Sequence, residues 1–193
     1  MMRIGFIRHG RTAWNKEGRS QGILDIPLDQ AGVAEAHMLA KRLCKEKWDV
    51  LYSSDLRRAK QTAEIIRKYI KNIDIHWDER LRERDSGKTA GTTEEERVKK
   101  WGKNWRDLDV GIESDARVID RGCSCLQDII ERYPRKNILI VSHGSFIKRV
   151  LKALLPEARD CLEKSLKNAS VTSVVKTEEG WLMERHNCTK HFD

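Results

Sequence analysis

The sequence predicts an α/β fold, a three-layer α/β/α sandwich around a mostly parallel central sheet. Short apolar runs that stop at polar or glycine residues alternate with longer amphipathic segments, the pattern of strands alternating with helices. Within the strands predicted at 3–7 and 137–142, residues 4–7 and 138–141 are apolar throughout, as expected of strands buried on both faces. The 193 residues suffice for a single domain, residues 1–193, with a small cap insertion at about 84–112.

The spacing of apolar residues predicts the remaining elements. Asp29 is a suitable N-cap for a helix at 29–46, and a helix at 55–71 carries Ala59, Thr62, Ala63 and Ile66 on one face. Glu178-Glu179-Gly180 predicts a hairpin turn. The predicted strands are 3–7, 49–53, 73–77, 137–142, 170–176 and 180–186, and the other predicted helices are 114–132 and one that begins at Ser145.

The cap segment, 84–112, lacks strong apolar periodicity and contains one predicted helix, Thr93 to Asp107. Within that helix a stripe of apolar side chains packs against the core, borders a functional site, or does both. The stripe consists of Val98, Trp101, Trp105 and Leu108.

The net charge of +8 suits an anionic partner. No polybasic tail is present, and basic residues are not interleaved with aromatic ones, so we expect a small anionic molecule rather than nucleic acid. No apolar stretch approaches the roughly 20 residues of a membrane span, and the N-terminus lacks the features of a signal peptide. We therefore expect a cytoplasmic protein without membrane attachment, while its oligomeric state is not predictable.

Five cysteines, an odd number, occur without a C-x-x-C pair. This pattern favours free thiols in a reducing compartment over disulfides or a metal site. The cysteines are Cys44, Cys123, Cys125, Cys161 and Cys188.

Two histidines follow buried strands, and each precedes a glycine: Arg8-His9-Gly10 and Ser142-His143-Gly144. Ligands of open α/β sheets bind at the carboxyl ends of the strands, so both imidazoles are expected in one crevice. The planar guanidinium of Arg8 can grip phosphate oxygens in pairs. His143, with the N–H of Gly144 beside it, can hydrogen-bond another oxygen.

Further polar residues are expected at the same edge of the sheet. Asn15 and Gln21 lie in the long loop after the first strand, where binding groups collect. Arg57 lies in the first turn of a helix, where it can point across the crevice, whereas we interpret Arg58 as a surface charge. Glu83 follows a strand and is either a proton donor, a salt-bridge partner or a helix cap.

Together these segments resemble the histidine phosphatase superfamily, the phosphoglycerate-mutase-like proteins, over nearly the whole chain. The similarity extends to the ending, Asn187-x-x-x-His191-Phe192, which resembles short phosphatase-type members. The matching motifs, in chain order, are Arg8-His9-Gly10-x-Thr12-x-Trp14-Asn15, Gln21-Gly22, Asp25-x-Pro27-Leu28, Ser53-Ser54-x-Leu56-Arg57-Arg58-Ala59-x-Gln61-Thr62-Ala63, Leu81-x-Glu83 and Val141-Ser142-His143-Gly144.

The resemblance implies a nucleophilic role for His9, which would form a phosphohistidine, and it implies neither a metal ion nor a cofactor. Arg8, Arg57 and a charged His143 would hold the transferring phosphoryl group. The residues that would complete the site are Asn15, Gln21 and Gly144 around the substrate, and Glu83 as proton donor to the leaving oxygen. The positive cluster is expected to lower the pKa of His9 and keep a neutral nitrogen ready to attack.

The resemblance leaves three functions open. The short insertion after Glu83 favours a phosphatase for small phosphorylated metabolites over a cofactor-dependent mutase, because a mutase must shield its phosphohistidine from water. A module that binds phosphorylated ligands without turnover is the third. The sequence departs from the family where Ala90 stands at the place of a second glutamate, which leaves the substrate unpredicted.

Overall fold

A computed structural model describes residues 2–158 and 160–192, which form the predicted sandwich. Its six-stranded sheet has the order β3-β2-β4-β1-β5-β6. Strands β3, β2, β4 and β1 are parallel, whereas β5 runs antiparallel to both β1 and β6, so the mostly parallel sheet is confirmed. The strands are β1 (Met2–Arg8), β2 (Val50–Ser53), β3 (Ile75–Trp77), β4 (Asn137–Ser142), β5 (Val171–Lys176) and β6 (Trp181–Cys188).

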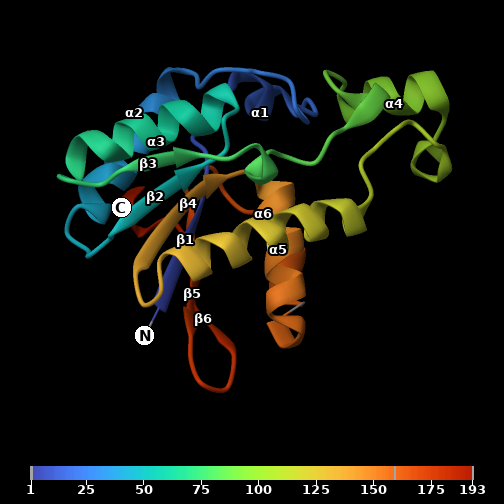
Figure 1. Cartoon of the computed structure of the whole chain (residues 1–193). Helices are drawn as coiled ribbons and strands as arrows, with labels where there is room; N and C mark the ends of the chain where they lie inside the picture. The colour runs from blue at the N-terminus through green and yellow to red at the C-terminus, as the bar shows by residue number, and fades with distance from the viewer. Residues whose placement is uncertain (1, 159, 193) are drawn as a thin grey trace.

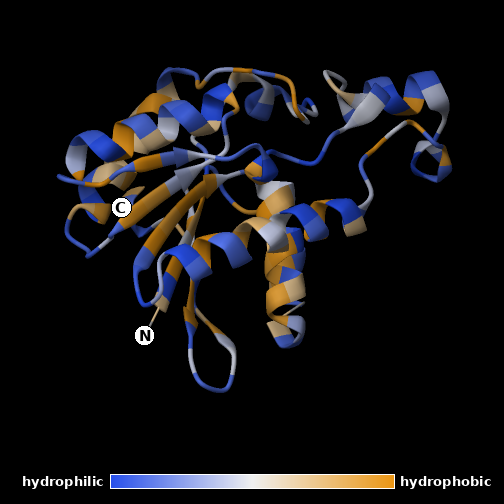
Figure 2. Cartoon of the chain, in the orientation of Figure 1, coloured by the Kyte–Doolittle hydropathy of each residue, from blue (hydrophilic) through white to orange (hydrophobic). Residues whose placement is uncertain are grey.

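Helices cover both faces of the sheet (Figure 1). α2 (Gln30–Leu43) and α3 (Arg57–Tyr69) lie on one face, and α5 (Asp115–Arg132) and α6 (Gly144–Leu154) lie on the other. Their apolar residues face the sheet and their polar residues face outward (Figure 2), as expected of amphipathic helices. Two shorter helices, α1 (Ala13–Glu17) and α4 (Glu94–Trp101), lie beyond the carboxyl ends of the parallel strands.

The central strand β4 shows why its sequence is apolar without alternation. Ile138 and Ile140 belong to the core under α5 and α6, while Leu139 and Val141 belong to the core under α2 and α3. Successive side chains of a strand point to opposite faces, so a strand covered on both sides needs an apolar residue at every position.

Several predicted boundaries differ from the structure. The predicted loop 8–28 contains α1, which Thr12 and Asn15 stabilise through a capping box. The predicted cap helix, Thr93 to Asp107, is wrong in its second half, because α4 ends at Trp101 and Gly102 takes a φ of 83°. A separate 3₁₀ turn follows at Trp105–Asp107. Trp105 is buried but Leu108 is 49% exposed, so only part of the predicted stripe packs.

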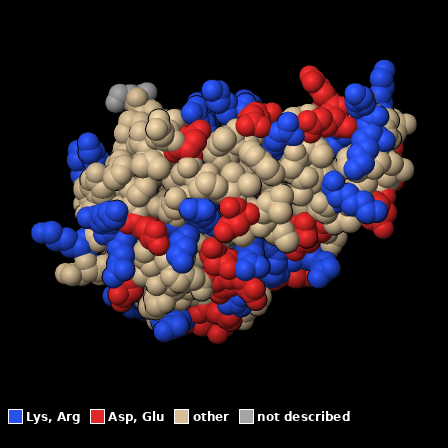
Figure 3. Space-filling model, turned by 90° about the horizontal axis from the view of Figure 1, so that it is seen from above, with Lys and Arg blue, Asp and Glu red and all other residues tan. Residues whose placement is uncertain are grey.

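The surface agrees with the composition. Figure 3 shows Lys and Arg interspersed with Asp and Glu on the face seen from above, rather than gathered into one basic field. All five cysteines are free, as predicted. None of the helices of residues 2–158 and 160–192 has the length and hydropathy needed to cross a bilayer.

Two glycines let the turn after β1 pack directly on α2. A Cβ atom at Gly10 would lie 2.5 Å from the carbonyl oxygen of Gly32, and one at Gly32 would lie 2.0 Å from the carbonyl oxygen of Arg11. The backbones therefore touch where a side chain would separate them. This contact holds the residues after β1 against α2, at the position of the predicted site.

Gly32→Ala is expected to destabilise the protein, although alanine normally stabilises a helix interior by about 1 kcal/mol relative to glycine. The new methyl group overlaps backbone atoms, which corresponds to a loss of about 1–3 kcal/mol. Urea unfolding measures the difference. Ala34→Gly, at an exposed position of the same helix, is the control for ordinary helix propensity. An unchanged or raised stability of Gly32→Ala would contradict the close packing.

Candidate active site

The pairing of β1 with β4 brings the two histidines together. Arg8 pairs with Ser142 in the parallel register, so His9 and His143 follow at the same level of the sheet. Their ring centroids are 5.2 Å apart. Both imidazoles are buried, His9 with 3% and His143 with none of its surface exposed. The predicted convergence of the two strand ends is therefore present in the structure.

His9 presents one specific nitrogen. Its Nδ1 lies 2.7 Å from the carbonyl oxygen of Gly10, and a carbonyl only accepts, so Nδ1 carries the proton. Nε2 then has a free electron pair and accepts a hydrogen bond from Nε of Arg58 at 3.2 Å. Burial, and after it the charges of Arg58 and Arg8, hold the pKa of His9 well below its ordinary value. The predicted direction of this pKa shift is correct, with burial as the larger cause.

Arg58, and not Arg57, faces His9. Arg57 is exposed, whereas Arg58 is 1% exposed and donates to the carbonyl oxygens of Leu24 at 2.7 Å and Gly22 at 2.8 Å. Burial lowers the pKa of Arg58 to about 10, so the guanidinium is still charged at neutral pH. The interpretation of Arg57 as the site arginine and Arg58 as a surface charge is wrong in its placement of both side chains.

The helical period of α3 indicates that Arg58 lies on the buried face of the helix. The buried face of α3 contains Thr62, and position 58 lies one turn before it on the same face. Position 57 is rotated by about 100° towards solvent. An arginine on a buried helix face requires polar partners, which is the condition of a functional residue.

Arg8 and His143 each bury a polar atom that has no hydrogen-bond partner within the described residues, Nε and Nδ1 respectively. Arg8 donates through Nη1 to the carbonyl oxygen of Leu166. Gly144 gives this guanidinium room, because a Cβ atom there would lie 3.3 Å from Nε. Buried polar atoms without partners are uncommon in proteins, and two of them beside His9 indicate a place for a polar ligand.

The surroundings of His143 favour its neutral form. Burial, followed by the charges of Arg58, His9 and Arg8, lowers its pKa well below the ordinary value. Its Nε2 lies 2.9 Å from the hydroxyl oxygen of Ser54, a partner that the sequence did not indicate. Ser54 thereby connects the end of β2 to the two histidines.

The two amide residues of the predicted site are held through their oxygens. Oδ1 of Asn15 accepts from the N–H of Thr12 at 3.1 Å and from Nδ2 of Asn168 at 3.2 Å. The Thr12 hydroxyl lies 3.1 Å from both Oδ1 of Asn15 and Oε1 of Gln21, and its single hydrogen is donated to one of them at a time. Because the oxygens are used in this way, the N–H groups of both amides are the ends left for a ligand.

Glu83 lies at the start of α6. Its carboxylate accepts three backbone hydrogen bonds, from Phe146 at 2.8 Å, Arg84 at 2.9 Å and Ser145 at 3.1 Å. Two of these N–H groups belong to the first turn of α6, whose dipole also favours a negative group there. The carboxylate is therefore held in one orientation.

A cavity of about 290 Å³ joins these groups. Of the predicted site residues, Arg8, His9, Asn15, Gln21 and Glu83 line it, while His143 lies behind His9. The cap borders the cavity through Thr89, Arg97 and Trp105, as one of the two predictions for its stripe proposed. Lining residues that the sequence analysis missed are Arg19, Ser20, Gly22, Arg58, Arg84, Ser86, Ile112 and Ser145.

Comparison with known proteins agrees with this arrangement. Residues 4–189 match the histidine phosphatase superfamily (branch 1). The chain belongs to this superfamily. It is 38% identical to phosphoglycerate mutase-like protein 4 of Arabidopsis thaliana, over 98% of this chain and 86% of the relative. It is 30% identical to the metal-independent phosphoserine phosphatase of the same plant, over 98% and 82%.

A solved structure extends the similarity to the fold. The His9-to-Ala mutant of phosphoserine phosphatase from Entamoeba histolytica, in complex with phosphoserine, has a TM-score of 0.83 and 29% identity over 99% of both chains. Within the described part of the present family member, no group of three or more His, Cys, Asp or Glu side chains is arranged to hold a metal ion.

The buried histidines make stability depend on pH. The folded protein keeps both neutral, while the unfolded chain protonates them near the ordinary value of 6.5. Stability rises with pH wherever the unfolded state binds more protons. The contribution of the two histidines to the free energy of unfolding is therefore fully present well above pH 6.5 and is lost as the pH falls below that value. Between pH 7.5 and 5.5 we expect a loss of about 2–3 kcal/mol, measured by urea unfolding. The double variant His9→Gln/His143→Gln is expected to lose most of this difference; an undiminished difference would refute the assignment.

The two adjacent arginines give a matched pair of variants. Arg58→Lys is expected to weaken the binding of inorganic phosphate by roughly 10- to 100-fold, because charge-assisted hydrogen bonds contribute about 1.5–3 kcal/mol. Arg57→Lys, at the exposed position, should change the affinity by less than about twofold. Isothermal titration calorimetry measures both. A larger effect at Arg57 would reverse the assignment made from burial.

Proposed function

We propose that this protein is a metal-independent phosphomonoesterase that hydrolyses small phosphorylated metabolites through a phosphohistidine on His9. The observation that carries the proposal is the tautomer of His9, a residue that lines the cavity: its Nδ1 is protonated, and its unprotonated Nε2 lies 3.2 Å from Nε of Arg58. Membership of the histidine phosphatase superfamily and the phosphoserine bound by the Entamoeba structure support the substrate class.

In the first half-reaction, Nε2 of His9 attacks phosphorus and the bond from phosphorus to the ester oxygen breaks. The leaving oxygen takes a proton from the carboxyl of Glu83. Nδ1 of His9 keeps its own proton, which it donates in a hydrogen bond to the carbonyl oxygen of Gly10. Arg58 donates two of its five N–H groups to the carbonyl oxygens of Leu24 and Gly22. Its Nε–H is released from Nε2 of His9 when that atom attacks, so three N–H groups are available to the phosphoryl oxygens. Arg8, the amide groups of Asn15 and Gln21, and His143 complete the set of donors.

In the second half-reaction, water attacks the phosphohistidine. The carboxylate of Glu83 accepts the proton of that water, the bond between phosphorus and Nε2 breaks, and inorganic phosphate leaves. The two cationic arginines offset the charge that develops on the phosphoryl oxygens without a metal ion.

Phosphoryl transfer of the mutase type is a second candidate, favoured by the 38% identity with a phosphoglycerate mutase-like relative. The two reactions differ only in what accepts the phosphoryl group from His9, water or an organic hydroxyl. Incubation with phosphoglycerate separates them, because hydrolysis releases inorganic phosphate and mutase activity produces the isomer.

The proposal is tested by phosphate release from p-nitrophenyl phosphate and a panel of phosphorylated metabolites, with EDTA present. We expect turnover by the wild type and a loss of at least about 10³-fold in His9→Ala, because the covalent step disappears. His37→Ala, which changes a histidine that does not line the cavity, is the control. Activity that survives His9→Ala, or that EDTA abolishes, would contradict the mechanism.

A further inference from the structure

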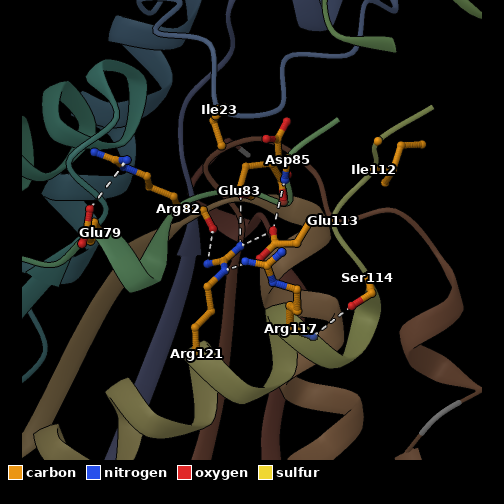
Figure 4. Close-up of a pocket in the computed structure, with 11 residues that line it drawn as sticks. Ile23, Glu79, Arg82, Glu83, Asp85, Ile112, Glu113, Ser114, Arg117 and Arg121 are labelled. Carbon is orange, nitrogen blue, oxygen red and sulfur yellow. Dashed lines mark hydrogen bonds and ion pairs between the residues drawn. The ribbon is translucent and has the colours of Figure 1, made fainter. Parts of the chain in front are cut away.

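The proton donor of the proposed reaction is held by an arginine outside the cavity. Arg121 of α5 donates five hydrogen bonds, the full capacity of a guanidinium. Three of them end on the backbone that leads to Glu83: Nη1 donates to the carbonyl oxygens of Arg80 at 2.7 Å and Arg82 at 2.8 Å, and Nη2 donates to that of Glu83 at 3.2 Å. Figure 4 shows Arg121 reaching from α5 towards this segment.

The other two hydrogen bonds end on Glu113. Nε of Arg121 lies 2.8 Å from Oε1 of Glu113, and Nη2 lies 3.0 Å from Oε2. Both side chains are largely buried, with 21% and 14% of their surfaces exposed. Although burial raises the pKa of Glu113, the hydrogen bonds from Arg121 and from the N–H of Asp85 outweigh it and hold this pKa below its ordinary value. The pair is thus a bidentate ion pair in one fixed geometry.

The segment held by Arg121 has little regular structure. It contains the 3₁₀ turn Glu79–Leu81, after which residues 82–86 belong to no helix or strand, so side chains fix part of their backbone. The hydroxyl of Ser142 holds the Leu81 carbonyl oxygen at 2.7 Å, and Arg121 holds the neighbouring carbonyls on both sides. These side chains therefore contribute to the path of the chain into Glu83.

Arg121 also touches the element that orients the Glu83 carboxylate. Its guanidinium lies over the ring of Phe146, 5.2 Å from the centroid. The N–H of the same Phe146 donates to Oε1 of Glu83 at 2.8 Å. One guanidinium therefore connects the backbone of Glu83 with the helix start that fixes its side chain.

We propose that Arg121, held by Glu113, is a positioning residue that sets the Glu83 carboxyl at the distance needed for proton transfer to the leaving oxygen. This inference rests on the proposed role of Glu83 as proton donor. A general acid acts only within hydrogen-bond reach, and a displacement of about 1 Å lowers the rate by roughly 100-fold. Arg121 does not line the cavity of His9, so its loss leaves the phosphate-binding groups in place.

The readout is the dependence of the rate on the leaving group. p-Nitrophenolate leaves without a proton, whereas the alkoxide of glycerol 2-phosphate needs one. In Arg121→Gln we expect kcat/KM, which reports only the first half-reaction, to fall by roughly 30- to 100-fold for glycerol 2-phosphate and by less than about fivefold for p-nitrophenyl phosphate. Arg121→Lys should not restore the rate, because a single ammonium cannot bridge the carbonyls and Glu113 together.

Two further variants keep the experiment decisive. Arg117→Gln, one turn earlier on α5 and exposed, makes none of these contacts and should leave both rates unchanged. Glu113→Gln weakens the two hydrogen bonds that hold Arg121. It should lower kcat/KM for glycerol 2-phosphate relative to that for p-nitrophenyl phosphate, as Arg121→Gln does, but by a smaller factor. It serves as the test should Arg121→Gln fail to fold, as judged by circular dichroism.

Glu83→Gln separates this inference from the proposed function. It should lower kcat/KM for glycerol 2-phosphate far more than kcat/KM for p-nitrophenyl phosphate, and adding Arg121→Gln should lower the former little further, since both changes remove one function. Equal losses of kcat/KM on both substrates in Glu83→Gln would overturn the role of Glu83 as proton donor. A clear leaving-group effect in Glu83→Gln with none in Arg121→Gln and Glu113→Gln would overturn the positioning role alone.

Discussion

The parallel pairing of β1 with β4 is the constraint on which the site depends. Its register aligns Arg8 with Ser142 and so delivers His9 and His143 to one level. A shift by one residue would turn every side chain of either strand to the opposite face of the sheet. Such a shift would also move Ile138 and Leu139 each into the opposite apolar core, where the close-packed neighbours do not match their shapes. The packing of the core thus determines the geometry of the chemistry.

The electrostatics of the site follow from burial. Two guanidinium groups and two imidazoles share a small volume, and burial is the largest cause of every pKa shift among them. Backbone carbonyls of Gly10, Gly22, Leu24 and Leu166 satisfy part of this cluster. A bound phosphate group would supply both the opposite charge and oxygen acceptors for the remaining N–H groups of this cluster. The site is therefore preorganised, with little rearrangement required on binding.

Much of this arrangement was predictable from local pattern. Buried strands, amphipathic helices and glycine turns identified the layers and the strand ends, because those signals depend on few residues. The assignment of Arg57 as the site arginine is wrong. It rests on the place of Arg57 in the first turn of the helix, whereas the helical period puts position 58 on the buried face of α3. The roles of Ser54 and Arg121 were not predictable, since they depend on contacts between segments distant in sequence. The end of α4 at Gly102 had a local signal, because glycine often follows the last residue of a helix.

The two ends of the cap segment meet at a narrow neck. The N–H of Lys88 donates to the carbonyl oxygen of Val110 at 2.8 Å, and the N–H of Glu113 donates to that of Asp85 at 3.0 Å. Gly87 takes a φ of 50° there, and a Cβ atom on it would lie 2.3 Å from the Val110 oxygen. The chain thus leaves the sandwich and returns at one point. A loop anchored in this way can change its length with an entropic penalty that grows only logarithmically, so the scaffold is suited to the exchange of this segment by recombination or design.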